Sequence, residues 1–242
     1  MQYIIQSKAY VAPGIVDLTL KGDTSSIKAP GQFVQISVPG FFLRRPISVA
    51  SWDADSLRIL FRFTGEGTRT IADMQPGSAL DILPGLGNGF DPSVSCQRPL
   101  VVGGGIGLPP LYGLTCALLA RGKAPTVLIG ASSAADLILI PDFQALDVPI
   151  HITTLDGSTG VQGLVTDVIS TIDHDYFFAC GPYPMLRAVA EKTDADGQIS
   201  LEERMACGFG ACMGCSCETR AGVKRVCKDG PVFKKGDILW HS

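Results

Sequence analysis

Five of the eight cysteines lie close together near the C-terminal end of the sequence. Cys207, Cys212 and Cys215 have the spacing C-x4-C-x2-C, and Cys227 supplies a fourth thiol further along the chain. Plant-type [2Fe–2S] clusters are held by four cysteine thiolates with this spacing. The intervening glycines let the backbone wrap tightly and point N–H groups at the sulfur atoms. The pattern therefore predicts a [2Fe–2S] cluster with these four cysteines as its metal ligands.

Two alternatives to this prediction stay open. Cys217 can replace Cys215 as the third ligand, although the C-x2-C step favours Cys215. A tetrahedral zinc site with four cysteines would instead show two short C-x2-4-C pairs. Disulfides are disfavoured because the N-terminal residues lack a basic segment followed by an apolar stretch, so we expect no secretion signal and a reducing compartment.

A second candidate site is the glycine-rich loop after the apolar run Leu100–Val102. Its glycines would let a pyrophosphate approach a helix N-terminus, and the prolines that follow suit a first helical turn. The loop is not a strict G-x-G-x-x-G, and no acidic residue follows the next strand in the usual place. Small neutral residues at 130–133, in place of an arginine, favour NAD over NADP. The candidate nucleotide-binding residues are Gly103, Gly104, Gly105 and Gly107.

Cys180 ends the last apolar run of the same zone, in Cys-Gly-Pro. A residue at that strand end faces the crevice where a nicotinamide would meet a flavin, which makes Cys180 the candidate catalytic residue. The alternative is a buried structural cysteine.

Two short motifs near the N-terminal end can bind a flavin. In Arg45-Pro46-Ile47-Ser48, the arginine can place a fixed cation against a diphosphate, and the serine hydroxyl can reach a flavin edge. The glycine turn at residues 65–68 offers backbone N–H groups to phosphate oxygens. Either motif alone is weak, since Arg-Pro-x-Ser occurs by chance and Gly-Glu-Gly is commonly a hairpin turn.

Three zones of composition would position these residues. Residues 1 to about 95 read as short strands separated by Gly, Pro and Asp, which predicts a small antiparallel barrel. From Pro99 to about Thr193, apolar strands alternate with helical stretches, which predicts a Rossmann-like parallel sheet covered by helices on both faces. From Ser200 onward the chain is rich in cysteine and glycine and should fold around its metal centre. We therefore expect three domains, at residues 1–96, 97–199 and 200–242.

Composition excludes several classes of protein. The net charge of −3 gives no electrostatic footprint for nucleic acid. The uncharged stretch from Pro99 to Ala120 is long enough to span a bilayer, but its glycines and prolines would break a helix in the middle. We therefore expect no nucleic-acid or membrane partner. A mean hydropathy of +0.27 suggests either two well-packed domains or a surface covered by a partner or a large cofactor.

The order of these motifs along the whole chain resembles the ferredoxin–NADP reductase superfamily. Within it, the sequence is most similar to the electron-transfer subunits of B-type, NAD-dependent dihydroorotate dehydrogenases. The most specific stretches are residues 202–217 and the closing Arg-Val-Cys-Lys-Asp-Gly-Pro-Val-Phe at residues 225–233. The superfamily usually has an aromatic residue where this chain has Ile47, so the residue that stacks on the flavin is not identified. The resemblance implies FAD binding by Arg45, Pro46, Ile47, Ser48, Phe61, Arg62, Phe63, Gly67 and Thr68.

The resemblance also implies an electron relay. A separate FMN-containing catalytic subunit would oxidise dihydroorotate to orotate in pyrimidine biosynthesis, and electrons would pass through the cluster to FAD and then to NAD. A cytoplasmic heterotetramer with two copies of each subunit is expected. The alternatives are a reductase module of another flavin and iron–sulfur complex, and a zinc-stabilised redox sensor that binds a dinucleotide.

Overall fold

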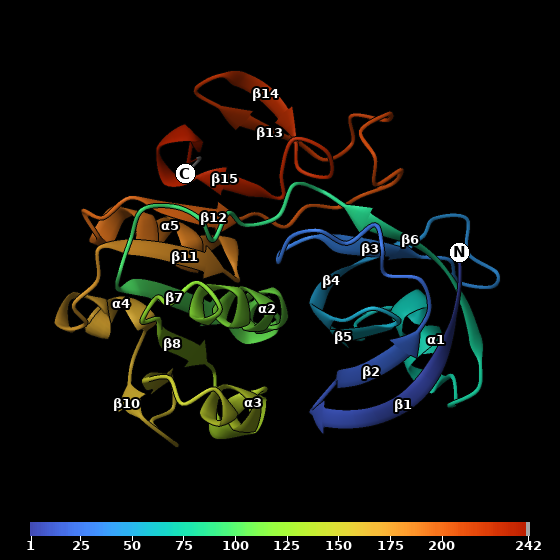
Figure 1. The fold of residues 1–242 in the computed structure, drawn as a ribbon, viewed down its shortest axis with the longest axis horizontal. Helices are drawn as coiled ribbons and strands as arrows, with labels where there is room; N and C mark the ends of the chain where they lie inside the picture. The colour runs from blue at the N-terminus through green and yellow to red at the C-terminus, as the bar shows by residue number, and fades with distance from the viewer. Residues whose placement is uncertain (241–242) are drawn as a thin grey trace.

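The computed structural model describes residues 1–240, which form a barrel, a parallel sheet and a small cysteine-rich region (Figure 1). The barrel and the sheet lie side by side, and the cysteine-rich region lies across the top of both in that view. The predicted order of an antiparallel barrel, a parallel-sheet domain and a small cysteine-rich C-terminal region is thereby confirmed. The predicted domain boundaries fall in the linker before the sheet and inside its sixth strand in chain order.

Six antiparallel strands close the barrel in the order β1-β2-β5-β4-β3-β6. Their inward side chains alternate along each strand, as Tyr3 and Ile5 do in β1, and form one apolar core. A helix, α1 (Glu66–Asp73), follows the fifth strand and buries Ile71 and Ala72 against that core. The strands are β1 (Gln2–Ala12), β2 (Ile15–Lys21), β3 (Phe33–Ile36), β4 (Arg45–Trp52), β5 (Ser56–Arg62) and β6 (Ala79–Leu86).

The second sheet has seven strands in the order β10-β9-β8-β7-β11-β12-β15, and all neighbours are parallel except the last pair. These strands are β7 (Pro99–Gly104), β8 (Thr126–Ala131), β9 (Ile150–Thr154), β10 (Val161–Gln162), β11 (Tyr176–Cys180), β12 (Gly197–Ser200) and β15 (Val232–Lys234). Its helices are α2 (Leu108–Leu119), α3 (Ile140–Ala145), α4 (Val165–Val168) and α5 (Tyr183–Lys192).

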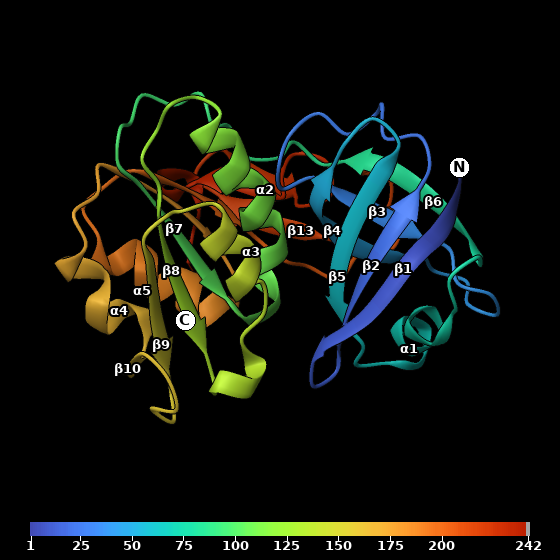
Figure 2. The same cartoon turned by 60° about the horizontal axis from the view of Figure 1, so that its bottom comes forward.

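Helices cover both faces of this sheet because its strands are apolar on both faces. In β7, Val101 packs with α2 and α3, whereas Leu100 and Val102 pack with α4 and α5 on the other side. Figure 2 shows α2 and α3 on one side of the sheet and α5 on the other. The uncharged stretch from Pro99 to Ala120 is therefore β7 followed by α2. None of the helices described here is long and apolar enough to cross a membrane.

The cysteine-rich region adds a hairpin and a strand. β13 (Ser216–Thr219) and β14 (Gly222–Arg225) form the hairpin, and β15 then pairs antiparallel with β12, with Ile199 opposite Phe233. The region is thus joined to the parallel sheet by backbone hydrogen bonds.

Direct contacts hold the barrel against the sheet. Helix α2 lies on β4, and a Cβ atom at Gly113 would lie 2.7 Å from the carbonyl oxygen of Ala50. Arg58 in the barrel pairs with Asp17 of β2 at 2.6 Å and also with Asp142 of α3. These contacts fix the relative position of the barrel and the parallel sheet.

Candidate functional site

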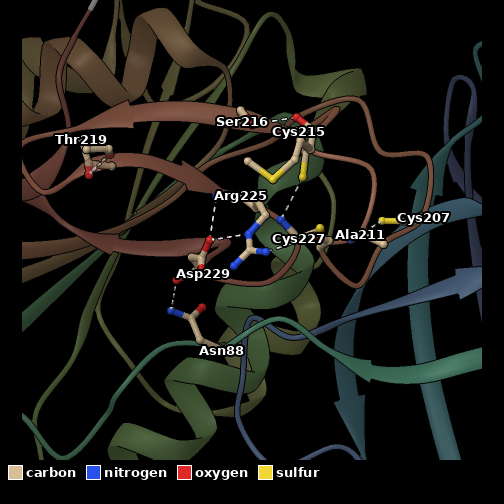
Figure 3. A network of polar contacts seen from close by, with 12 residues as sticks. Asn88, Cys207, Ala211, Cys215, Ser216, Thr219, Arg225, Cys227 and Asp229 are labelled. Atoms are coloured by element: carbon tan, nitrogen blue, oxygen red, sulfur yellow. Dashed lines mark hydrogen bonds and ion pairs between the residues drawn. The ribbon is translucent and has the colours of Figure 1, made fainter.

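The β13–β14 hairpin brings the third and fourth cysteines together. Cys215 directly precedes β13 and Cys227 closely follows β14, so the antiparallel pairing places them side by side. The backbone N–H of Cys227 donates a hydrogen bond to Cys215 Sγ (3.4 Å; Figure 3). Burial and the neighbouring Cys215 thiol raise the pKa of Cys227 to about 12. Two thiols this close ionise together only when a cation compensates their charge, which is what a bound metal supplies.

The first and second cysteines form another pair on the loop before the hairpin. Burial raises the pKa of Cys207, but backbone N–H groups of Cys212 and Phe209 outweigh it and lower this pKa to about 6. The N–H of Ala211 also donates to Cys207 Sγ at 3.3 Å. Gly208 and Gly210 have φ values of +78° and +91°, which the tight loop requires. The loop is therefore built to stabilise thiolates.

This arrangement into two pairs suits two irons better than one ion. No three His, Cys, Asp or Glu side chains within residues 1–240 are gathered closely enough to hold a single metal ion. A [2Fe–2S] cluster needs four thiolates around two irons, and all eight cysteines are free thiols. Cys217 lies in β13 and lines a separate cavity between α5 and the hairpin.

The predicted flavin-binding residues converge on one cavity in the barrel. It has a volume of about 370 Å³ and is lined by Pro46, Ile47, Ser48, Phe61, Arg62 and Thr68. Arg45 and Gly67 lie next to it, where a Cβ atom at Gly67 would approach the Arg45 guanidinium to 2.5 Å. Phe63 lies apart, with its ring against Tyr10 and under the guanidinium of Arg69.

One wall of this flavin cavity comes from the C-terminal part of the chain. Met205 and Pro231 both line it, close in sequence to Cys207 and Cys227. Nearby, a Cβ atom at Gly208 would lie 2.5 Å from the side-chain amide of Gln35 in β3. That amide is fully buried, and neither its nitrogen nor its oxygen has a hydrogen-bond partner in the described chain. A polar group bound between β3 and the Cys207–Cys212 loop would satisfy this amide, and the residues around the adjoining cavity fit a flavin next to the cysteines.

A larger cavity, of about 660 Å³, opens at the carboxyl ends of β7, β8 and β9. Gly104, Gly105 and Gly107, three of the candidate nucleotide-binding residues, line it, and the buried Thr153 hydroxyl on its wall has no hydrogen-bond partner among residues 1–240. Gly103 does not line it. A side chain at Gly103 would instead collide with Leu108, so this glycine serves the packing of α2 on β7.

Two acidic residues of this nucleotide cavity were not predicted from the sequence. Asp136 lines it and accepts a hydrogen bond from Ser133 Oγ at 2.9 Å. It lies in a 3₁₀ turn several residues beyond the end of β8, so a search at the strand end does not find it. Glu202 lines both the flavin and the nucleotide cavities together with Arg62 and Ile106. Its side chain keeps contact with solvent, but desolvation by the surrounding cavity walls raises the pKa of its carboxyl group. The two cavities therefore share a wall.

Cys180 ends β11 directly beneath the glycine loop. Its side chain is only 2% exposed, and burial raises the pKa of its thiol. A Cβ atom at Gly107 would collide with the Cys180 carbonyl group. The thiol does not line either cavity, whereas the following residues Gly181 and Pro182 do line the nucleotide cavity.

Comparison with known proteins agrees with this geometry. Residues 202–239 match the iron–sulfur cluster binding domain of dihydroorotate dehydrogenase B. The chain is also similar along its length to a solved NADH-dependent reduced ferredoxin–NADP oxidoreductase, with 27% identity, a TM-score of 0.90, and coverage of 98% of this chain and 90% of that chain. A ferredoxin NADP+ reductase from Neisseria gonorrhoeae shares the fold, with a TM-score of 0.69, 17% identity, and coverage of 79% of this chain and 89% of that chain.

Two curated relatives cover nearly the whole chain. The dihydroorotate dehydrogenase B (NAD(+)) electron transfer subunit of Bacillus pumilus (strain SAFR-032) is 42% identical, over 97% of this chain and 96% of the relative. Its counterpart from Geobacillus kaustophilus (strain HTA426) is 40% identical over the same shares of the two chains. With this degree of identity over this length, the chain belongs to the family of electron transfer subunits of NAD-dependent dihydroorotate dehydrogenase B.

Proposed function

We propose that this chain passes electrons from the FMN of a dihydroorotate-oxidising subunit through a [2Fe–2S] cluster and FAD to NAD. The observation that carries the proposal is the spatial order of three sites, from the cysteine pairs to the flavin cavity and then to the nucleotide cavity. The cysteine pairs are joined to the flavin cavity through Met205 and Pro231, and the flavin cavity shares a wall with the nucleotide cavity. A cluster exchanges single electrons and a flavin one or two, which is the conversion that a nicotinamide requires.

In this proposal Cys207 and Cys212 would hold one iron, and Cys215 and Cys227 would hold the other. The hydrogen bond from the Cys227 N–H to Cys215 supports Cys215 over Cys217 as third ligand. Cys215→Ser is expected to lose the cluster and Cys217→Ser to keep it. Iron content and the visible spectrum of the two purified variants decide the question, and the opposite pattern would exclude this ligand set.

The flavin diphosphate is assigned to Arg45 and the start of α1, and the isoalloxazine ring to the cavity wall formed by Ile47, Ser48 and Phe61. The glycine loop would hold the nicotinamide dinucleotide, with Asp136 available to accept hydrogen bonds from ribose hydroxyls. Burial keeps the Cys180 thiol protonated. Its role would be to support the backbone beneath the place where the nicotinamide meets the flavin.

The partner is assigned as an FMN-containing catalytic subunit in a heterotetramer with two copies of each chain. The exposed loop around the cysteines supports a docking face here, because Phe209 and Met213 are 56% and 50% exposed on either side of Cys212. Co-expression of both subunits, followed by measurement of the mass of the complex, tests the stoichiometry. The proposed location is the cytoplasm, where free cysteines remain reduced.

The test of the whole proposal is the visible spectrum of the purified protein under anaerobic conditions, before and after NADH is added. Overlapping flavin and iron–sulfur bands that bleach together, with two irons per chain, are expected. A colourless protein that contains zinc would exclude the relay and favour a zinc-stabilised redox sensor. Bleaching that is not reversed by a dihydroorotate-oxidising partner and orotate would favour a reductase module of another complex.

A further inference from the structure

A single turn joins the cysteine pairs to the wall of the flavin cavity. The turn begins at Cys227, whose N–H contacts Cys215, and ends at Pro231, which lines the flavin cavity. Contacts that hold this turn in place also set the distance between the cluster and the flavin. The contacts within and around it therefore bear on electron transfer.

Arg225 holds this turn closed. Its Nε and Nη2 donate hydrogen bonds to the Asp229 carboxylate at 2.9 and 3.2 Å, and its backbone N–H donates to the same carboxylate at 2.8 Å. Figure 3 shows Arg225 between Asp229 on one side and Cys227 on the other. Both side chains are about three-quarters buried, with exposed fractions of 26% and 27%. An ion pair this shielded is held more firmly than a surface pair.

The same guanidinium reaches the loop that carries the other two cysteines. Nη1 of Arg225 donates a hydrogen bond to the carbonyl oxygen of Gly210 at 3.1 Å. Gly210 lies between Cys207 and Cys212. One planar group therefore ties the loop of the first cysteine pair to the turn of the second pair.

The far side of the turn is fixed to the linker between the barrel and the parallel sheet. The Asn88 side chain donates to the Val232 carbonyl at 2.8 Å and accepts from the Val232 N–H at 3.1 Å. The backbone N–H of Asn88 donates to the Gly230 carbonyl at 2.7 Å. The turn is thus held from both sides, by Arg225 toward the cysteines and by Asn88 toward the barrel and sheet.

The charge of Arg225 also lies close to the cysteines, near enough to the thiols of Cys215 and Cys227 to interact with them electrostatically. A cluster gains negative charge when it is reduced, so a nearby cation favours reduction and a nearby carboxylate opposes it. Arg225 and Asp229 therefore act in opposite directions on the same centre.

We propose that Arg225 is a positioning residue that holds the Cys207–Cys212 loop against Cys227, and thereby fixes the cluster relative to the flavin cavity and sets how readily it is reduced. The inference rests on the proposed function, since it requires the cluster and the flavin. Only an arginine can fulfil this role, because its fork supplies separate donors to Asp229 and to Gly210, whereas lysine is a single point charge.

The decisive variant is Arg225→Lys, with Arg220→Lys as the matched control on the exposed turn of the same hairpin. We expect Arg225→Lys to keep its flavin and iron and to be reduced by NADH at the flavin at the rate of the unmodified protein. Electron transfer from flavin to cluster should be at least tenfold slower, because the tie to Gly210 is lost, whereas the cluster reduction potential should stay close to that of the unmodified protein, because lysine keeps the positive charge. Anaerobic stopped-flow absorbance separates the two rates, and a redox titration followed by electron paramagnetic resonance gives the potential.

Asp229→Asn is the second variant, and it keeps the arginine. Loss of the carboxylate should move the cluster potential in the positive direction, because the Arg225 cation is then left uncompensated. A potential unchanged in Asp229→Asn, or an Arg225→Lys protein with the transfer rate of the Arg220→Lys control, would overturn the inference. Equal slowing of flavin and cluster reduction in Arg225→Lys would also overturn it. Iron missing from the unmodified protein would instead overturn the proposed function.

Discussion

Gly67 is a position where one added methyl group should act directly on flavin binding. A Cβ atom there would lie 2.5 Å from Nε of Arg45 and would displace the guanidinium that we assign to the flavin diphosphate. Gly67→Ala is expected to weaken FAD binding about tenfold, or about 1.4 kcal/mol, without loss of iron. Fluorescence titration of flavin-depleted protein measures the affinity. Gly65→Ala is the control, because nothing lies within 4 Å of a Cβ atom at Gly65, and equal losses in both variants would contradict the prediction.

Cys180 should make the free energy of unfolding depend on pH under alkaline conditions. Burial raises the pKa of its thiol above the ordinary value of 9.0, so above pH 9 the unfolded chain releases a proton that the folded protein keeps. The free energy of unfolding should therefore fall above pH 9, by about 1.4 kcal/mol per pH unit for this one group. Cys180→Ala should remove this part of the slope. Urea unfolding at pH 8 and pH 10 measures it, and identical slopes in the two proteins would refute the assignment.

Local sequence motifs predicted the candidate site as a whole better than they predicted which individual residues line it. The cysteine spacing and the Arg-Pro-x-Ser motif are local patterns, and the structure places most of their residues around the predicted cavities. Phe63 lies off the flavin cavity because it follows the end of β5 and its ring packs on Tyr10, and Gly103 lies off the nucleotide cavity because it serves the packing of α2 on β7. Asp136 and Glu202 were not predicted because the cavity walls that they line are built from segments distant in sequence. Asp136 reaches its wall from a 3₁₀ turn and Glu202 from beyond a strand end.

At the scale of elements, helix α2 is fitted to the barrel as closely as to its own sheet. Alanine normally favours a helix over glycine by up to about 1 kcal/mol. At Gly113, however, the new Cβ atom would lie 2.7 Å from the carbonyl oxygen of Ala50 in β4. We therefore expect Gly113→Ala to lower the free energy of unfolding by about 1–3 kcal/mol. Thermal denaturation tests this against Gly236→Ala, whose Cβ atom would touch nothing within 4 Å, and a higher Tm for Gly113→Ala would disprove the tight fit.

The predictable elements were those with a strong pattern of their own. Strand β7 is a continuous apolar run, and the predicted run Leu100–Val102 lies inside its observed bounds, Pro99–Gly104. Helix α1 was not predicted, because its glycines read as a turn and its stability comes from Ile71 and Ala72 buried against the barrel. Strand β12 has Ile199 as its only large apolar residue, and it is a strand because β11 and β15 supply hydrogen bonds on both sides.

At the scale of the whole molecule, the ion pair between Arg58 and Asp142 links the barrel to the sheet. Asp142→Asn should leave both domains folded but weaken their contact, at a cost of about 1–2 kcal/mol, because a hydrogen bond between charged groups is lost. Limited proteolysis of the linker at residues 87–98 should become faster. Asp147→Asn is the control in the loop after α3, where the exposed side chain makes no ion pair with any residue of the described range 1–240. Equal cleavage of the two variants would show that the pair does not restrain the domains.

Strand β15 limits how the iron–sulfur domain can be exchanged between proteins by recombination. Its three residues complete the parallel sheet by pairing with β12, which precedes the cysteines in sequence. The stretch that matches the iron–sulfur domain, residues 202–239, therefore excludes the strand against which its own last strand lies. A recombination event that transplanted this stretch alone would leave an unpaired strand edge in both the donor and the recipient. Inheritance of the iron–sulfur module should accordingly be coupled to that of the nucleotide-binding sheet, so that the two diverge as one unit.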